Sequence, residues 1–436
     1  MRLGQLRILC ILCITATLIA VPFNGSARAE RIFFAGYNGG FYLKSQEEGG
    51  MELRLGGSFQ ADYRAYAENE RADNRFDIRR ARLIFRGGLT QWFRFAMEYE
   101  FQGNETNNLV DAYGELVFSG LTALRFGQFK EPFSLEWQSP DKASWFVERS
   151  MGYYLTPQRD IGLMLHGSRY EEALHFAVGF FNGDGDDGST RGNHHDTPEI
   201  TGRFVAAPLK SSSIDLLRNA QIGVSASYAK IDTANLDLKV KSTGMAGLTR
   251  NLYILTHDTK FGVIQDVDAR YRYGLEGAWT WHNISLAGEY VHLTYTDLDP
   301  SSGPTQDADF SSWYVSMAWC PTGEYFILSQ GAIKPVYPDR FFNPADGTYG
   351  ALCLAVRYNH FTGDEDWITP SANVSVRKAD AISLAATWIL FPMHRIILDF
   401  TTTDFSDRIR ARVNPDGSID YIDKENVITL RMAMDF

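Results

Sequence analysis

Cysteine is scarce in this sequence, and long apolar runs are absent beyond its N-terminus. The chain has four cysteines, two of which, Cys10 and Cys13, lie near the N-terminus. With only Cys320 and Cys353 remaining, a disulfide-rich scaffold is excluded. Beyond residue 29 no stretch of about 18 apolar residues occurs. The sequence therefore predicts no transmembrane helix in that part of the chain.

Residues 1–29 have the layout of a secretory signal peptide. Two arginines precede an apolar run over residues 8–21, and an Ala-Arg-Ala tripeptide ends at Ala29. A charged region, an apolar region and an A-x-A site in this order predict export and cleavage, and the run is short for the alternative, a membrane anchor. Three of the 42 basic residues and none of the 53 acidic residues leave with this segment, so the mature chain has a net charge of −14.

The chain is rich in aromatic residues, which make up 14% of it and follow a period of two. In residues 51–65 apolar side chains take most odd positions and polar or charged side chains most even positions, and residues 91–102 and 269–281 repeat this alternation. Successive strand side chains point to opposite faces, so each segment reads as a strand with one apolar and one polar face. In an exported chain, this pattern is typical of a transmembrane β-barrel with lipid outside and water inside.

The fold class predicted is all-β: a 16-stranded antiparallel transmembrane β-barrel with inward-folded loops. We expect residues 30–50 to form a short N-terminal periplasmic segment and residues 51–436 to form the barrel domain. The predicted strands alternate long loops with short turns, as bacterial outer-membrane barrels do. They cover residues 51–66, 75–88, 91–102, 109–118, 122–129, 159–168, 173–182, 198–208, 219–230, 269–281, 284–297, 310–320, 348–360, 379–391, 394–405 and 424–436.

One segment leaves an alternative open. Residues 324–335 are also strand-like, and pairing them with residues 39–45 gives a barrel of 18 strands. We favour 16 because four prolines lie between Pro321 and Gly347, and proline is rare inside barrel strands. That stretch is therefore expected to be a periplasmic excursion.

The C-terminus agrees with an outer-membrane location. The last strand alternates apolar and polar residues and ends on Phe436, the usual recognition signal for the outer-membrane insertion machinery. Together with the signal peptide, it predicts a protein of the outer membrane of a Gram-negative bacterium. Outer-membrane lipid and lipopolysaccharide are the partners expected around such a barrel.

Arginines form a column on the strand predicted near residues 75–88. Arg80, Arg82 and Arg86 share one face, and Ala81, Leu83 and Phe85 share the other. Unpaired guanidinium groups are too costly to bury in an apolar core, so the arginines should face the lumen. Candidates on neighbouring strands are Arg54 and Arg125.

Carboxylates with the same lumen parity leave two interpretations of this column. Glu98, Glu100, Asp111 and Glu115 lie on the next two predicted strands. If the arginines are free, they form an anion track. If they face these carboxylates, the two sets form a transverse field across the lumen, as in general porins.

Several segments resemble the phosphate-selective porin O/P family. They are FDIRRARL at residues 76–83, LRFGQFKEPFSLE at 124–136, VERS at 147–150, RDIG at 159–162, FFNGDG at 180–185 and YGLE at 273–276. The resemblance implies a 16-stranded homotrimeric channel whose third extracellular loop folds into the lumen. It also implies that arginines and lysines guide anions such as phosphate to the constriction.

The segment 130–158 is the expected inward loop. Within it Lys130, Ser134 and Lys142 are candidates to present ammonium and hydroxyl donors to an anion. The alternative for Lys130 is an ion pair with Glu131 or with a carboxylate of the wall.

Two departures from the family pattern bear on phosphate selectivity. Where the resemblance leads us to expect an Arg-x-Arg pair, the chain has Lys239 and Lys241, and where it leads us to expect a basic pair in the periplasmic excursion, the chain has Lys334 alone. Lysine keeps the charge but lacks the bidentate fork that suits phosphate.

The sequence favours a passive channel for small anionic solutes, with no cofactor, no metal site and no nucleic-acid partner expected. A general or weakly cation-preferring porin and a structural or adhesive barrel with a plugged lumen are the alternatives. An enzyme is the weakest hypothesis because no nucleophile with a matching base stands out. Cys320 and Cys353 lie near opposite ends of the predicted strand map, so no disulfide between them is expected.

Overall fold

The computed structural model describes residues 32–436 except residues 48, 68–70, 103–107, 120–121, 184–197, 234–235, 247, 249 and 369–373. The predicted signal peptide, residues 1–29, lies outside the described residues. Within them, no helix has both the length and the apolar character needed to cross a membrane.

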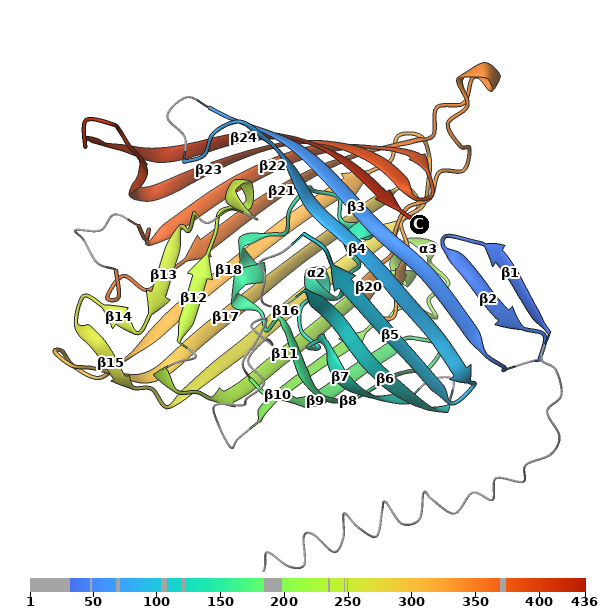
Figure 1. The fold of residues 1–436 in the computed structure, drawn as a ribbon, viewed down its shortest axis with the longest axis horizontal. Helices are drawn as coiled ribbons and strands as arrows, with labels where there is room; N and C mark the ends of the chain where they lie inside the picture. The colour runs from blue at the N-terminus through green and yellow to red at the C-terminus, as the bar shows by residue number, and fades with distance from the viewer. Residues whose placement is uncertain are drawn as a thin grey trace, which may run out of the picture.

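Sixteen antiparallel strands form a closed barrel (Figure 1), which confirms the predicted fold. The last strand pairs with the first, from Val427 opposite Tyr66 to Asp435 opposite Ser58. The strands are β3 (Glu52–Tyr66), β4 (Arg75–Thr90), β5 (Phe93–Glu100), β6 (Leu109–Ser119), β7 (Thr122–Lys130), β8 (Arg159–Arg169), β9 (Leu174–Phe181), β10 (Glu199–Ala206), β11 (Ala220–Lys230), β16 (Ala269–Trp281), β17 (Ile284–Pro300), β18 (Gln306–Trp319), β21 (Ala351–Thr362), β22 (Lys378–Phe391), β23 (His394–Val413) and β24 (Ile419–Asp435).

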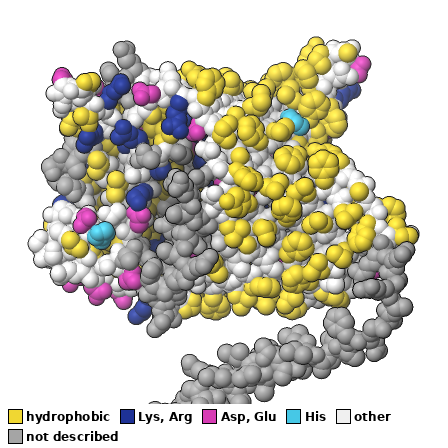
Figure 2. Space-filling model, in the orientation of Figure 1, with side chains coloured by type: hydrophobic (Ala, Val, Ile, Leu, Met, Phe, Trp, Pro, Cys, Tyr) yellow, Lys and Arg dark blue, Asp and Glu magenta, His cyan; other side chains and the backbone are white. Residues whose placement is uncertain are grey.

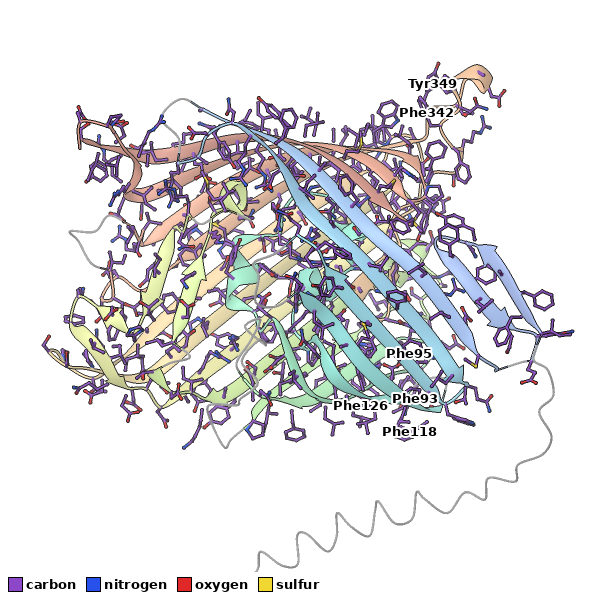
Figure 3. The ribbon with its side chains drawn as sticks, in the orientation of Figure 1. Phe93, Phe95, Phe118, Phe126, Phe342 and Tyr349 are labelled. Carbon is purple, nitrogen blue, oxygen red and sulfur yellow. A yellow bond between two sulfur atoms is a disulfide. The ribbon has the colours of Figure 1, made fainter. Side chains whose placement is uncertain are left out.

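The outer wall is apolar, as the period of two predicts. On β16, Tyr273 and Leu275 are 46% and 55% exposed, whereas Arg272 and Glu276 are buried in the interior. Figure 2 shows hydrophobic side chains over much of the wall in view, with charged side chains gathered toward the long-loop end at the left. Near the short-turn end, Phe93, Phe95, Phe118 and Phe126 lie close together on β5–β7 (Figure 3). Aromatic side chains at the rim of an apolar wall are typical of a barrel in lipid.

A hairpin extends the wall at the short-turn end. It consists of β1 (Phe33–Tyr37) and β2 (Phe41–Ser45), and β2 pairs with β3 from Phe41 opposite Leu55 to Lys44 opposite Glu52. β24 ends beside Ser58, so β2 occupies the place next to β3 that β24 leaves free.

The segment between β18 and β21 contributes no barrel strand. Its strands β19 (Leu328–Ser329) and β20 (Ala332–Ile333) have two residues each and pair with one another. This arrangement excludes the alternative of 18 strands. The Arg203 side chain of β10, which is buried in the interior, donates a hydrogen bond to the Gly331 carbonyl at 2.6 Å, so the β19–β20 turn reaches into the barrel.

The expectation that no disulfide joins the two cysteines is wrong, because Cys320 and Cys353 form a disulfide with their Cα atoms 4.0 Å apart. β18 and β21 are antiparallel neighbours, with Trp319 opposite Leu354. The end of β18 therefore lies beside the start of β21, at the short-turn end. The prediction placed the two cysteines at opposite ends, although antiparallel neighbours bring such positions together.

A long loop fills part of the interior. Residues 231–268 include β12 (Asp237–Val240), β13 (Tyr253–Thr256), β14 (Asp258–Thr259), β15 (Gly262–Asp266) and the short helix η5 (Thr243–Met245). Apolar side chains of this loop pack on apolar inward side chains of β17, β18, β22 and β23 in the largest buried cluster of the protein. The cluster includes Leu238, Val240, Leu252, Tyr253, Leu255, Val291, Leu293, Tyr295, Phe310, Ala379 and Phe405. Where this loop covers the wall, both faces of the wall are apolar.

Candidate functional site

The loop after β7 folds into the barrel, as predicted. Residues 131–158 contain the short helices α2 (Leu135–Gln138), η1 (Asp141–Ala143) and η2 (Met151–Leu155). The backbone N–H groups of Leu135 and Glu136 donate to the Glu289 carboxylate of β17 at 2.8 and 2.6 Å. The first turn of α2 is thus attached to the opposite wall of the barrel.

A buried cluster of charges attaches the other half of this loop. Glu148 accepts from Arg79 at 2.8 and 3.1 Å, from Arg64 at 2.6 Å and from Arg431 at 3.0 Å. Asp62 accepts from Arg64 and Arg431 as well. Burial alone raises the pKa of Glu148, but Arg79, Arg431 and Arg64 hold it well below its usual range.

Arg79 reaches this cluster because β4 has a bulge. Gln60 on β3 pairs with Arg80 and Ala61 pairs with Ile78, which leaves Arg79 without a partner on β3. The extra residue lets Arg79 and Arg80 both contact groups inside the barrel. Alternation counted back from Arg80 places Arg79 on the outer face, so Arg79 was not among the predicted lumen residues. The only signal in the sequence was the pair of adjacent arginines.

The arginine column of β4 is mostly paired with carboxylates. Arg82 lies 2.8 Å from Glu98, 2.6 Å from Glu100 and 3.4 Å from Asp141 of the inward loop. Arg80 donates to the Gln60 side chain at 2.8 Å, and its Nε lies 3.3 Å from Asp141. Arg86 is more open, since its side chain is 59% exposed and lies 3.9 Å from Glu98.

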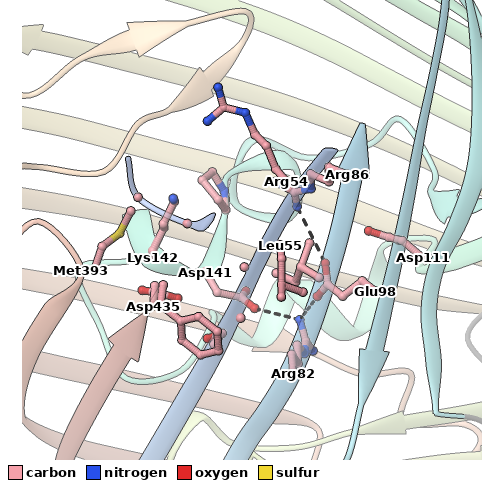
Figure 4. Close-up of a pocket in the computed structure, with 18 of the residues that line it drawn as sticks. Arg54, Leu55, Arg82, Arg86, Glu98, Asp111, Asp141, Lys142, Met393 and Asp435 are labelled. Atoms are coloured by element: carbon pink, nitrogen blue, oxygen red, sulfur yellow. Dashed lines mark hydrogen bonds and ion pairs between the residues drawn. The ribbon is translucent and has the colours of Figure 1, made fainter. Parts of the chain in front are cut away.

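A cavity of about 240 Å³ lies between this column and the tip of the inward loop (Figure 4). Its charged lining contains six basic and four acidic side chains. The basic residues are Arg54, Arg82, Arg86, Lys130, Lys142 and Arg159, and the acidic residues are Glu98, Asp111, Asp141 and Asp435. Five of the sequence-predicted residues thus line one cavity.

The two lysines of this cavity differ from the arginines. Lys130 Nζ donates to the Trp137 carbonyl at 2.6 Å and lies 4.5 Å from the centre of the Trp137 ring. Among the described residues, no carboxylate lies within 4.0 Å of Lys130 or Lys142 Nζ, whereas Arg54 pairs with Glu52. Burial lowers the pKa of Lys142, an effect that Asp435 partly offsets.

The other predicted residues lie outside this cavity. Ser134 is buried, and its Oγ accepts the Trp137 N–H as the N-cap of α2. Arg125 pairs with Glu115 at 2.8 Å and stacks on Tyr113. Lys239 is half exposed and pairs with Asp237.

Burial lowers the pKa of Lys241, which lies near Arg79, and of Lys334, where Glu172 partly offsets the effect. In the described part of the chain, no group of three His, Cys, Asp or Glu side chains is arranged to hold a metal ion.

A family profile described as phosphate-selective porin O and P matches residues 53–436. The chain belongs to this family of outer-membrane porins. The family and the barrel fold point to a channel rather than an enzyme. No curated protein matches the chain.

Solved porin structures share the fold at low sequence identity. An anion-selective porin from Comamonas acidovorans is 12% identical with a TM-score of 0.53, covering 88% of this chain and 100% of its own. The trimer form of OmpT, an outer membrane protein of Vibrio cholerae, is 9% identical with a TM-score of 0.52, covering 89% and 100%. OprB of Pseudomonas putida is 9% identical with a TM-score of 0.52, covering 89% and 94%.

Proposed function

We propose that this porin lets small hydrophilic anions, phosphate among them, diffuse passively through its lumen. The observation that carries the proposal is the cavity lining, where basic side chains outnumber acidic ones and Lys130 and Lys142 have no carboxylate partner among the described residues. Charges more than about 8–10 Å apart are screened at physiological salt, so local lumen charges outweigh the acidic net charge of the whole chain.

The path for solutes runs on the polar side of the interior. Residues 231–268 and their apolar contacts occupy the space beside β17, β18, β22 and β23. The space beside β3 and β4 and the loop tip is lined by charged groups and glycines instead. A hydrated anion loses less solvation beside such groups than beside an apolar wall.

The pairing of the arginines argues for moderate selectivity. Arg80, Arg82 and Arg125 each have a carboxylate partner, so the wall is closer to a transverse field than to a free arginine track. This pairing is also what favours the second candidate, a general or weakly cation-preferring porin.

Planar-bilayer recording of the purified protein in a potassium chloride gradient tests the proposal. A reversal potential shifted toward the chloride equilibrium potential, together with inhibition of the chloride current by added phosphate, supports an anion channel. A reversal potential shifted toward the potassium equilibrium potential supports the cation-preferring alternative. Absence of conductance in correctly folded protein supports a plugged, structural barrel.

We also propose that the chain is exported through a cleaved signal peptide and assembles as a homotrimer surrounded by lipid and lipopolysaccharide. The layout of residues 1–29 and the apolar outer wall support this. N-terminal sequencing of the mature protein tests the cleavage, and cross-linking of outer-membrane extracts tests the trimer. An intact Met1 or a protein that cross-links only as a monomer contradicts it.

A further inference from the structure

Three guanidinium groups converge on one carboxylate at the tip of the inward loop. Asp141 Oδ1 accepts from Arg149 Nη2, and Asp141 Oδ2 lies 3.3 Å from Arg80 Nε and 3.4 Å from Arg82 Nη1. Burial raises the pKa of Asp141, but Arg149, Arg80, Arg82 and Lys130 hold it well below its usual range. Asp141 therefore carries a full negative charge at neutral pH.

The positions of these arginines are determined by other contacts. Arg80 and Arg82 belong to β4, where Gln60 and Glu98 also accept from them. Arg149 lies over the ring of Trp137 at 4.9 Å and over that of Tyr153 at 5.2 Å. The donors thus stay in place when the group that they bind changes.

This donor set is suited to an oxyanion. Guanidinium groups bind carboxylates and phosphates through charge-assisted hydrogen bonds, and several of them around one centre meet several oxygens at once. Arg80 Nε is buried and has no hydrogen-bond partner among the described residues, with only the ion-pair contact to Asp141. A tetrahedral oxyanion offers more oxygens than the two of Asp141.

We propose that Arg80, Arg82 and Arg149 form a binding site for a small oxyanion, and that Asp141 occupies this site as an internal ligand. A phosphate or carboxylate solute then competes with Asp141 for the three guanidinium groups. This competition shortens the time for which the solute stays bound. The inference rests on the proposed function, because the solute reaches the site through the anion path.

Access to the site comes from the cavity. Asp141 lines the cavity of about 240 Å³ together with Arg82 and Lys130, and its side chain is 23% exposed (Figure 4). Two smaller cavities behind it, lined in part by Arg149, also touch Asp141. Asp141 thus lies between the open cavity, which Arg82 also lines, and the smaller cavities that Arg149 lines.

Removal of the Asp141 charge has a definite consequence. Arg82 keeps Glu98 and Glu100, but Arg80 and Arg149 lose the carboxylate with which they form an ion pair among the described residues. An external oxyanion then binds without competition. A channel needs binding weak enough to release the ion, so such a variant should trap phosphate.

The test measures phosphate inhibition of chloride current for Asp141→Asn, Asp141→Glu and Glu98→Gln in planar bilayers. We expect Asp141→Asn to lower the half-inhibiting phosphate concentration by about tenfold, the equivalent of one strong hydrogen bond to a charged group. Asp141→Glu, which keeps the internal carboxylate, should behave like the wild type.

Glu98→Gln is the matched control, because it removes one negative charge from the same cavity but leaves Arg80 and Arg149 paired. Equal inhibition in Asp141→Asn and Glu98→Gln, or no change in Asp141→Asn, would overturn the proposal. Asp141→Ser serves as a second variant if Asp141→Asn does not fold. The shift is measured relative to the wild type, so it stands even if the wild type prefers cations and the proposed function fails.

Discussion

The guanidinium group of Arg79 binds the Glu148 carboxylate through two hydrogen bonds, Nε to Oε1 at 2.8 Å and Nη2 to Oε2 at 3.1 Å. This pair joins the bulge of β4 to the inward loop. Glu148→Gln should therefore loosen the loop and cost about 3–5 kcal/mol locally, because Arg64 and Arg431 stay buried and lose a carboxylate. Hydrogen exchange of residues 140–150 should become faster, and single-channel current should become noisier.

Glu365→Gln is the control for this variant, since its ion pair with Arg377 is exposed and worth about 0–1 kcal/mol. The pH dependence follows from the low pKa of Glu148. A carboxylate whose pKa is lowered in the folded protein stabilises fully above its usual value of 4.5 and loses this effect as the pH falls below it. Unchanged exchange in Glu148→Gln would show that the loop is attached elsewhere.

The second prediction concerns Lys130, whose ammonium group lines the cavity and has no carboxylate partner among the described residues. Lys130→Glu replaces a basic side chain by an acidic one beside the solute path, so the anion preference should weaken or reverse. The reversal potential in a salt gradient measures this. Lys230→Glu makes the same charge change at an exposed pair with Asp268 and should leave the selectivity near the wild-type value. Equal shifts in both variants would remove Lys130 from the path.

The third prediction is a pH dependence that comes from Lys142. Burial lowers its pKa below the usual 10.5, so Lys142 loses its charge at a lower pH than an ordinary lysine does. As the pH rises above neutral, the anion preference should therefore begin to fall at a lower pH than the titration of ordinary lysines would predict. Lys142→Arg keeps its charge throughout this range and should flatten the profile. A profile unaffected by Lys142→Arg would place the titration on another group.

Period-two alternation predicted the barrel well because lipid and lumen select opposite side chains along every strand. The segment 269–281 agrees with β16 at both ends. The exception is the β23–β24 hairpin, which extends to Val413 and starts again at Ile419, well beyond the predicted 394–405 and 424–436. Three successive polar residues, 406–408, interrupt the alternation, which resumes with buried Ile409 and Ala411 between exposed Arg408 and Arg410.

The interior was harder to predict because its contacts join residues far apart in the sequence. Val291, Leu293 and Tyr295 face inward although they are apolar, since the loop 231–268 covers them. A bulge at Arg79 changes the parity that the alternation rule assumes. Ser134 carries a hydroxyl group that is able to donate a hydrogen bond to an anion, but its Oγ accepts the Trp137 N–H. No spacing rule in the sequence reveals this contact.

The last prediction concerns the disulfide between Cys320 and Cys353. It closes a loop over a sequence separation of 33 residues, and this loop includes the β19–β20 turn that binds Arg203. A covalent loop of this length restricts the unfolded chain by ~3–4 kcal/mol in the entropic description. Paired Cys320→Ser and Cys353→Ser substitutions should lower the temperature at which the barrel loses its folded gel mobility, and a reducing agent should have the same effect on the wild type alone.

In denatured wild-type protein, a thiol reagent should label neither cysteine before reduction and both after it. Labelling without reduction would contradict the bond, and an unchanged unfolding temperature in the double variant would mean that the strand ladder of β18 and β21 alone holds this end of the barrel.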